Sequence, residues 1–437
     1  MAVAMRPRWS NWAGTYACEP VSIESPASED EIVAVVNAAR AAGQRVKVAG
    51  VGHSFTDIAC TDGRMIRLDR YDRVLDVDTA AATATVQAGI TIEKLGVELA
   101  RHGLAQENAG DIAYQSIAGA ISTATHGTGA TLGNIATQIV GLSMVLADGS
   151  LLTCSADTDP DLLAACRVGL GALGVISTVT LRCLPLFNLH SVEQPRDLDE
   201  VLEQIDALVD GNRHFEFFWF PHTDRVQSIT NNPTAEPIRT RGRASTYLND
   251  ILLENSAFGL VCRIGRARER WIPALNRFSV RLLSRSEVVD TSARVFANPR
   301  LVRFSEMEYA IPRAAAVETI GELRAMIARR EHLVGFPVEV RFVAADDIML
   351  SPAHGRDTCY IAVHIFQGMS YEPYFRDVEA ITSAVGGRPH WGKLHFQSAD
   401  TLRPRYPRFD DFLAVRNRVD PERRFGNAYL DQVLGRS

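Results

Sequence analysis

Near the start of the chain, two glycines, Gly50 and Gly52, stand directly before His53 and Ser54. Because glycine has no Cβ, backbone N–H groups at such positions can close around a phosphate. The preceding residues, Arg45–Ala49, alternate polar and apolar side chains, which predicts a strand ending at Gly50. A histidine directly after such a cradle either contacts the bound group or is covalently joined to it. The segment therefore predicts a site for a phosphate-bearing group.

A second glycine-rich segment, Gly169–Gly174, has the G-x-G-x-x-G spacing of nicotinamide-dinucleotide sites. Such a site needs a strand before the glycines and a helix after them, so that the helix N-terminus faces the pyrophosphate. Here the order is reversed, because residues 161–168 have helical character and the β-branched run 175–183 is typical of a strand. We interpret the segment as a tight helix-to-strand turn whose backbone can lie against a flat ring system.

Small helices and strands alternate around these glycines in the first part of the chain. A capping box, Ser28–Glu31, opens an apolar-periodic helix that ends near Gly43. Residues 73–78 and 83–88 predict two short strands around a turn, and the apolar spacing of residues 92–99 predicts the next helix.

From about residue 190 the expected elements become longer. Residues 214–220 and 338–343 predict strands, and residues 316–329 predict a helix. The segment Asn231–Arg243 is rich in Asn, Pro, Thr and Arg, which predicts a surface loop.

The composition limits the classes of protein to consider. The chain has 437 residues, 46% of them apolar and 22% charged, which is typical of a globular protein of two or three domains. The net charge of −6 gives no basic footprint for nucleic acid. No apolar run reaches the roughly 20 residues of a membrane span, and the start has no secretory signal. The seven cysteines show no Cys-x-x-Cys spacing, which indicates a reduced compartment and no metal site. We expect a cytoplasmic protein, with association to a membrane surface left open.

Four segments, in this order, resemble the sugar-1,4-lactone oxidases and dehydrogenases, a family of vanillyl-alcohol-oxidase-like FAD flavoproteins: Val51–Gly63, Thr123–Gly129, Leu170–Ile176 and Pro389–His395. The resemblance extends over nearly the whole chain and implies an α+β fold. Residues 1–185 would form a two-subdomain FAD-binding domain of the PCMH type. Residues 186–437 would form an α+β substrate-binding cap domain, with the last ~45 residues packing back on the FAD domain.

The resemblance also implies that the cofactor is FAD, joined to His53 through an 8α-histidyl link. Such a link would raise the reduction potential of the flavin and fix its ring. The alternative is a histidine that only hydrogen-bonds within its loop. Gly110 aligns near the reactive edge of the flavin and leaves room for oxygen, but relatives described as dehydrogenases share this glycine. The residues expected to bind the cofactor are Val48, Ala49, Gly50, Val51, Gly52, His53, Ser54, Phe55, Gly110, Asp111, Ser116, Gly119, Thr123, Thr125, His126, Gly174 and Ile176.

Glu339 and Arg341 would share one face of a strand. By resemblance, Glu339 accepts hydrogen bonds from sugar hydroxyls, and Arg341 orients the reacting C2 hydroxyl and stabilises negative charge as its proton leaves. Lys393 would stabilise the reduced flavin. The alternative for the Glu-x-Arg pair is a solvated ion pair. His364 either faces the same pocket or lies in the core, and we do not expect His390 to act as a base.

The function expected from the resemblance is oxidation of the C2 hydroxyl of an aldono-1,4-lactone, foremost L-gulono-1,4-lactone, by hydride transfer to flavin N5. The product would become L-ascorbate, and the electrons would pass to O2, cytochrome c or a dye. An alditol or xylitol oxidase of the same superfamily is the main alternative. A flavin-binding protein without sugar chemistry is a more distant one, and a nicotinamide dehydrogenase would rest on Gly169–Gly174 alone.

Overall fold

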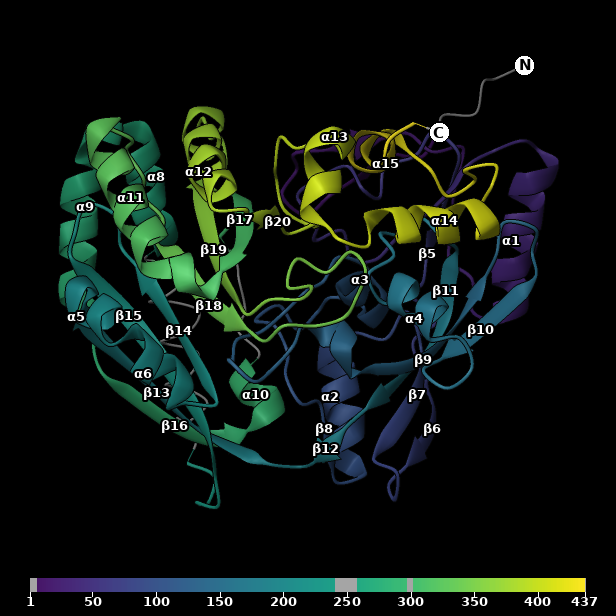
Figure 1. Cartoon of the computed structure of the whole chain (residues 1–437), viewed down its shortest axis with the longest axis horizontal. Helices are drawn as coiled ribbons and strands as arrows, with labels where there is room; N and C mark the ends of the chain where they lie inside the picture. The colour runs from purple at the N-terminus through teal and green to yellow at the C-terminus, as the bar shows by residue number, and fades with distance from the viewer. Residues whose placement is uncertain (1–5, 240–257, 297–301, 437) are drawn as a thin grey trace.

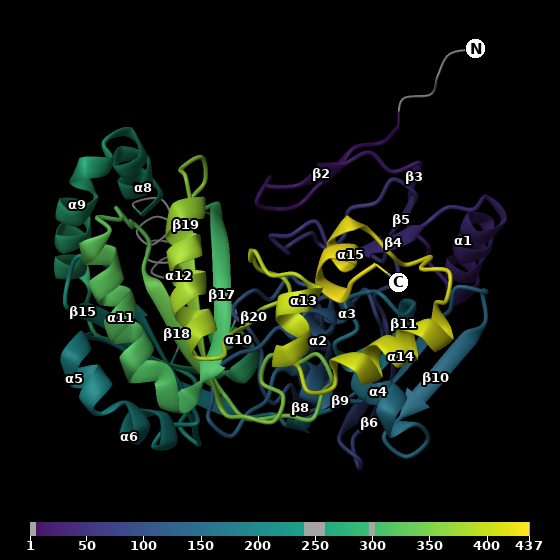
Figure 2. The same cartoon turned by 45° about the horizontal axis from the view of Figure 1, so that its top comes forward.

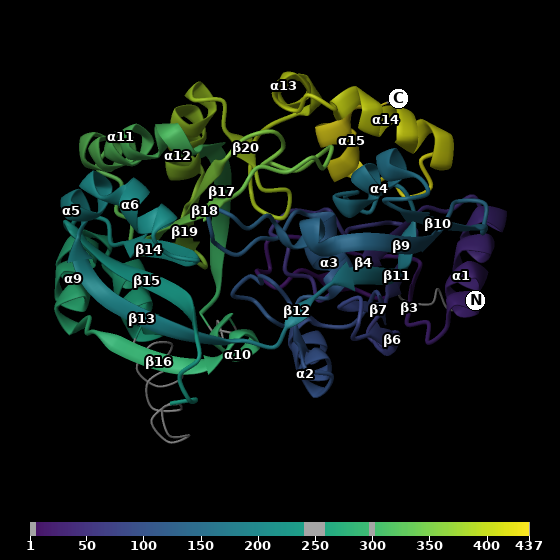
Figure 3. The same cartoon turned by 60° about the horizontal axis from the view of Figure 1, so that its bottom comes forward.

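Two groups of helices and strands lie side by side in the computed structural model (Figure 1). One group contains the N-terminal part of the chain and its C-terminal helices, and the other contains the largest sheet with the helices that cover it. The short strand β12 (Leu184–Pro185) lies where the chain passes from the first group to the second (Figure 3). The structure describes residues 6–239, 258–296 and 302–436.

A small parallel sheet at the start of the chain carries the first glycine segment. Its strands, in spatial order, are β3 (Ser22–Glu24), β5 (Arg64–Arg67) and β4 (Val46–Ala49), and helix α1 (Glu29–Ala41) joins β3 to β4. Ser28 caps α1 by accepting from the Glu31 N–H, as predicted. The Glu31 carboxylate accepts from the Ala27 N–H, however, and not from that of Ser28.

A five-stranded antiparallel sheet completes the first group. Its strands, in spatial order, are β10 (Leu151–Ser155), β9 (Ile139–Val145), β11 (Val175–Arg182), β7 (Thr83–Gln87) and β6 (Val74–Asp78). Beside α1, the first part of the chain contributes the helices α2 (Ile92–Arg101), α3 (Ile117–Ser122) and α4 (Pro160–Arg167) to this group.

The second group is built on an eight-stranded sheet in which every neighbouring pair of strands is antiparallel. The spatial order is β16 (Ser286–Thr291), β13 (Asn188–Asp197), β15 (Arg225–Thr234), β14 (His214–Trp219), β18 (Val338–Val343), β19 (Thr358–Phe366), β17 (Phe304–Pro312) and β20 (Arg388–Pro389). One face packs against α5 (Leu198–Glu203), α6 (Ile205–Asp210), α11 (Ala316–Arg329) and α12 (Glu372–Ala384).

The alternation of side chains gives the two faces of this sheet different chemistry. Phe217 on β14 and Val340 on β18 belong to the apolar core under the helices. Their neighbours along the strands, Glu216 and Arg341, point to the opposite face, because successive side chains of a strand alternate. This opposite face faces the first group of elements (Figure 1).

The C-terminal segment returns to the first group and completes its core. Helices α13 (Ala399–Leu402), α14 (Phe409–Val419) and α15 (Ala428–Leu434) share one apolar cluster with α1 and β4, and Figure 2 shows them against that group. Asn427 Nδ2 donates to the carbonyl oxygens of Asp57, Ile58 and Cys60, each at 3.0 Å. The Val46 N–H donates to the Arg424 carbonyl at 2.8 Å, which ties β4 to the same segment.

The α+β fold agrees with the sequence prediction, as do the strands β14 and β18 and the helix α11. The surface loop predicted for Asn231–Arg243 is wrong at its start, because residues 231–234 belong to β15 and pair with β13. This paired backbone outweighs the turn-forming residue types, and residues 240–243 lie outside the described residues. Among the described helices, none is long and apolar enough to cross a membrane. All seven cysteines are free thiols.

Candidate active site

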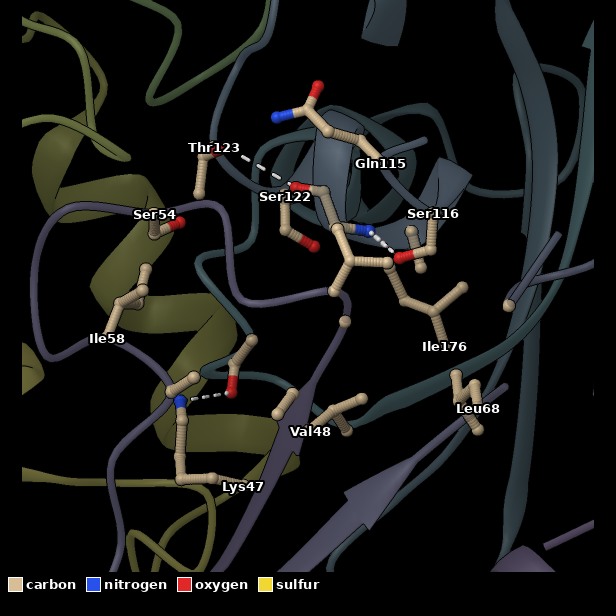
Figure 4. Close-up of a pocket in the computed structure, with 18 of the residues that line it drawn as sticks. Lys47, Val48, Ser54, Ile58, Leu68, Gln115, Ser116, Ser122, Thr123 and Ile176 are labelled. Atoms are coloured by element: carbon tan, nitrogen blue, oxygen red, sulfur yellow. Dashed lines mark hydrogen bonds between the residues drawn. The ribbon is translucent and has the colours of Figure 1, made fainter. Parts of the chain in front are cut away.

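A cavity of about 220 Å³ lies where β4 ends, which we call the glycine-lined cavity (Figure 4). Three segments meet there: the loop after β4, the start of α3, and the turn between α4 and β11. Of the residues predicted to bind the cofactor, this cavity is lined by Val48, Ala49, Gly50, Val51, Gly52, His53, Ser54, Ser116, Gly119, Thr123, Gly174 and Ile176.

Gly50 lets the loop after β4 lie directly against α3. A Cβ at this position would stand 2.8 Å from Ser116 Oγ, which itself caps α3 by accepting from the Gly119 N–H. The N–H groups of Val51 and Gly52 donate to no acceptor within the described residues. Buried or cleft-lining amides without partners are the groups that a bound phosphate satisfies.

The turn Gly169–Gly174 follows helix α4 and precedes strand β11, so the predicted reversed order is confirmed. A Cβ at Gly174 would stand 2.8 Å from the Val145 carbonyl oxygen, so only glycine allows this close packing. No helix N-terminus follows these glycines, which removes the basis for a nicotinamide site.

Lys47 is a charged residue of the glycine-lined cavity that the sequence analysis did not single out. Its Nζ donates to the carbonyl oxygens of Gly171 and Phe425, at 3.1 and 3.2 Å (Figure 4 shows the first). Burial, and then the charge of Arg416, lower the pKa of Lys47 to about 7. A lysine within an apolar strand was the available signal.

His53 lines the glycine-lined cavity and is held by two aromatic side chains. Its ring stacks on Trp12 with centroids 4.6 Å apart, and its Nε2 lies 2.7 Å from the Tyr114 hydroxyl. Burial, and then the charge of Lys393, lower the pKa of His53 to about 4. His53 is therefore a neutral imidazole at pH 7. Since the Tyr114 hydroxyl contacts Nε2, Nδ1 is the ring nitrogen that Tyr114 leaves available for a bond to another group.

A second cavity of about 130 Å³ lies against the charged face of the eight-stranded sheet, and we call it the carboxylate-lined cavity. Gln115 lines both cavities, so the two adjoin. Four residues expected to bind the cofactor line this second cavity instead of the first: Gly110, Asp111, Thr125 and His126. Phe55 lines neither, because its ring is buried against Phe304 with centroids 5.6 Å apart.

Arg341 is surrounded by three carboxylates from three different parts of the chain. Its Nη2 lies 2.6 Å from Asp111, and its Nε lies 2.6 Å from both Glu216 and Glu339. The oxygens lie out of line with the N–H bonds, so these contacts are ionic and not well-aligned hydrogen bonds. Burial alone would lower the pKa of Arg341, but the three carboxylates raise it, and Arg341 is a fixed cation.

Lys393 lies beside this group and pairs with a buried glutamate. Its Nζ is 2.5 Å from Glu306 Oε2, and His364 Nε2 is 3.4 Å from Glu306 Oε1. Burial alone would lower the pKa of Lys393, but Glu306, Glu308 and Glu339 raise it. Burial alone would raise the pKa of Glu306, but Lys393 and His364 lower it to about 2. His364 therefore lines the cavity and is not a residue of the apolar core.

His126, Glu308 and His390 place three metal-ligating atoms within 4.8 Å of one another. His390 Nδ1 accepts from the Gly392 N–H, so neutral His390 carries its proton on Nε2 and offers no lone pair there. His126 Nδ1 lies 2.8 Å from the Gly127 carbonyl and donates to it, and its Nε2 is 3.1 Å from Glu308. This pattern favours a network of hydrogen bonds over metal ligation.

The residues at the junction of the cavities fit a flat cofactor that carries phosphates. Gln115 Oε1 and Thr125 Oγ1 are buried without a hydrogen-bond partner within the described part of the chain, so they are available to a bound ring. The glycine-lined cavity supplies the unpartnered amides described above, and FAD would place its phosphates there.

Three carboxylates were missed by the sequence analysis: Glu306 and Glu308, which line the cavity, and Glu216, which pairs with Arg341. Each stands in a strand and is less than 9% exposed; Glu216 and Glu308 have buried apolar neighbours on both sides, and Glu306 has Met307 on one side. A carboxylate that alternates with apolar residues, as in the Glu-x-Glu of β17, was the available signal. The same pattern did identify Glu339 and Arg341.

Solved structures share this fold. A solvent-stable cholesterol oxidase superposes with a TM-score of 0.85 over 99% of this chain and 98% of its own, at 19% identity. A cholesterol oxidase from B. sterolicum superposes with a TM-score of 0.83 over 98% and 97%, at 17% identity. The sequence profile of the FAD binding domain matches residues 20–155. Fold and site together define an FAD-dependent oxidoreductase.

The second half of the chain narrows this class to a family. The D-arabinono-1,4-lactone oxidase profile matches residues 179–433. The L-gulono-1,4-lactone dehydrogenase of Mycobacterium tuberculosis is 49% identical over 99% of this chain and 100% of its own length. The L-gulonolactone oxidase of Bos taurus is 39% identical over 98% of both. The chain belongs to this family of sugar-1,4-lactone oxidoreductases.

Proposed function

We propose that this protein oxidises the C2 hydroxyl of L-gulono-1,4-lactone. The main support is the carboxylate-lined cavity, in which Glu339, Arg341 and Lys393 stand within one pocket that adjoins the glycine-lined cavity through Gln115. The names of the related gulonolactone enzymes support the same substrate. The 2-keto product would tautomerise to L-ascorbate.

Each charged residue has a distinct task in this proposal. Glu339 accepts hydrogen bonds from sugar hydroxyls, and Arg341, held by its three carboxylates, orients the C2 hydroxyl and stabilises the negative charge left as its proton departs. The bound FAD supplies a hydride acceptor. Lys393 adds a fixed positive charge to the carboxylate-lined cavity. It is close enough to His53 to lower the pKa of that histidine.

We also propose that FAD is covalently attached through His53. The neutral ring of His53 lines the glycine-lined cavity, and Tyr114 engages its Nε2, which leaves Nδ1 as the nitrogen that would bond the 8α-methyl group. If the link exists, denatured protein keeps its yellow fluorescence on a gel. A colourless band with free flavin in the supernatant would contradict it.

The organisation of the chain follows from the same proposal. Residues 1–185 would hold FAD, residues 186–437 would carry the substrate-binding face, and the returning C-terminal segment would belong to the FAD unit. We propose a cytoplasmic location, and O2, cytochrome c or a dye as electron acceptor. Anaerobic reduction with gulonolactone, followed by reoxidation with each acceptor in turn, identifies which of them is used.

The variant Glu339→Ala tests the site. We expect the rate of gulonolactone-dependent bleaching of the flavin to fall at least a hundredfold, since a pairing carboxylate is lost from the substrate pocket. Glu318→Ala, at an exposed position of α11, is the matched control. Unchanged bleaching in Glu339→Ala would show that the site is wrongly assigned.

Steady-state rates on gulonolactone and on xylitol test the substrate class. We expect the lactone to react faster, and a faster reaction with xylitol would indicate an alditol oxidase. If neither compound bleaches the flavin of the unmodified protein, the protein is not an enzyme of this type.

A further inference from the structure

The segment 263–285 concentrates positive charge in an otherwise acidic chain. It contains seven arginines and one acidic residue, Glu269, so it carries a formal charge of +6, whereas the whole chain carries −6. The rest of the chain therefore carries −12. The overall composition hides this segregation, which is typical of a segment that meets an anionic surface.

Four short helical pieces form this segment, which we call the basic ridge. They are the end of α8 (Phe258–Ala267), the 3-10 turn Glu269–Trp271, then α9 (Ile272–Ser279), and the 3-10 turn Val280–Leu282 that continues α9. The ridge lies at the outer edge of the molecule, on the side away from the glycine-lined cavity (Figures 1 and 2). All seven arginines are exposed: Arg263, Arg266, Arg268, Arg270, Arg277, Arg281 and Arg285.

Large apolar side chains stand exposed among these arginines. Trp271 is 57% exposed, Phe278 is 56% exposed and Leu282 is 69% exposed. Their spacing of seven and four residues places them on one helical face. Ile272 and Asn276, which lie on the opposite face, are buried against the domain. The exposed face therefore alternates aromatic or aliphatic tips with guanidinium groups.

We propose that the basic ridge docks this protein onto a membrane surface that contains anionic lipid. A helical face with exposed Trp, Phe and Leu side chains flanked by arginine is suited to lie at the boundary between head groups and acyl chains. Arginines within the Debye length of an anionic surface are attracted to it, and the −12 of the remaining chain directs this face toward the lipid.

Charge complementarity decides between a lipid surface and other occupants. The apolar side chains of the ridge protrude and are more than half exposed, whereas a helix or peptide partner would require a groove lined by them. The ridge exposes three large apolar side chains with arginines between them in the sequence, whereas the core of an obligate protein interface is larger and depleted of charge. An anionic lipid surface satisfies both the guanidinium groups and the apolar tips.

Two paired variants test the proposal by co-sedimentation with vesicles of phosphatidylcholine alone and of phosphatidylcholine mixed with phosphatidylglycerol. Arg277→Gln/Arg281→Gln removes two charges that the fold does not use in a hydrogen bond within the described residues. Trp271→Ala/Phe278→Ala removes the apolar tips. The control, Arg101→Gln/Arg376→Gln, removes two exposed arginines outside the ridge.

We expect the flavin-loaded protein to bind the anionic vesicles only, with affinity that falls as salt rises. Each arginine near such a surface contributes about fivefold, so Arg277→Gln/Arg281→Gln should lower the partition coefficient about 25-fold. Trp271→Ala/Phe278→Ala should lower it at least tenfold. The control should stay within about twofold, and thermal melting of each variant checks that the fold is retained.

Three results would overturn the proposal. The first is equal binding to both kinds of vesicle or to neither. The second is an equal loss of binding in the ridge variants and the control. The third is a dimer in lipid-free sedimentation velocity that the ridge variants dissociate, because the ridge would then be an interface between copies of this chain.

Discussion

Replacing Glu306 with glutamine should lower the pKa of Lys393, so that this lysine loses its charge at a lower pH than in the unmodified protein. In the unmodified protein the pKa of Lys393 is raised above its ordinary 10.5, because Glu306 and its neighbours outweigh the effect of burial. Glutamine keeps the shape of Glu306 and removes its charge. The 2.5 Å contact with Lys393 Nζ then loses its ionic partner.

The size of the effect follows from the burial of the pair. Breaking a buried ion pair by removing one partner costs about 3–5 kcal/mol, and one unit of pKa corresponds to about 1.4 kcal/mol. The proton affinity of Lys393 should therefore fall by roughly two to four orders of magnitude, which lowers its pKa. Lysine is charged below its pKa, so Glu306→Gln keeps the cation at low pH and loses it at a lower pH than the unmodified protein does.

The assay is the anaerobic rate of flavin bleaching by gulonolactone from pH 6 to pH 9. It is measured by stopped flow, because the short time after mixing limits hydrolysis of the lactone. We expect the bleaching rate of the unmodified protein to stay constant toward high pH and that of Glu306→Gln to fall toward high pH. Glu318→Gln, at an exposed position of α11, is the control, because Glu318 is not among the carboxylates that raise the pKa of Lys393. A Glu306→Gln profile that matches the unmodified protein across this range would refute the reasoning about Lys393.

Three further predictions follow from contacts in the structure. Tyr114→Phe should lower the fraction of protein with covalent flavin, measured by in-gel fluorescence, because His53 loses the partner of its Nε2. Gly174→Ala should cost about 1–3 kcal/mol of stability and reduce flavin content, because its Cβ would meet the Val145 carbonyl at 2.8 Å. Gly321→Ala, in the interior of α11, should instead raise stability by about 0.5–1 kcal/mol, since no atom lies within 4 Å of its Cβ.

Each of these has an outcome that contradicts it. Full flavin attachment in Tyr114→Phe would mean that the orientation of His53 is set by Trp12 alone. Equal melting temperatures for Gly174→Ala and Gly321→Ala would mean that the two glycines do not differ in packing.

Local patterns predicted the elements that carry the site. The alternation in residues 338–343 predicted a strand with Glu339 and Arg341 on one face, and the structure has that strand. The reversed order around Gly169–Gly174 was also readable from propensity, because helix and strand formers stand on either side.

The neighbours of these residues could not be predicted, because tertiary pairing brings them together. Glu216 lies opposite Arg341 only through the pairing of β14 with β18. Glu306 meets Lys393 only where β17 passes the loop after β20. Contacts between residues so far apart along the chain cannot be inferred from local sequence patterns. Phe55 illustrates the converse, since it was itself predicted to bind the cofactor and yet packs into the core against Phe304.

The return of the C-terminal segment has a consequence for biosynthesis. The glycine-lined cavity is bordered by β4, and β4 is hydrogen-bonded to Arg424 and Phe425, so this wall lacks part of its support until the end of the chain has been made. At 5–20 residues per second, a ribosome needs roughly 10–50 s to pass from residue 185 to residue 425. During this interval the N-terminal part waits with its apolar surface uncovered. Loading of the flavin is thus expected after translation ends, and loss of the last helix should leave a protein without cofactor.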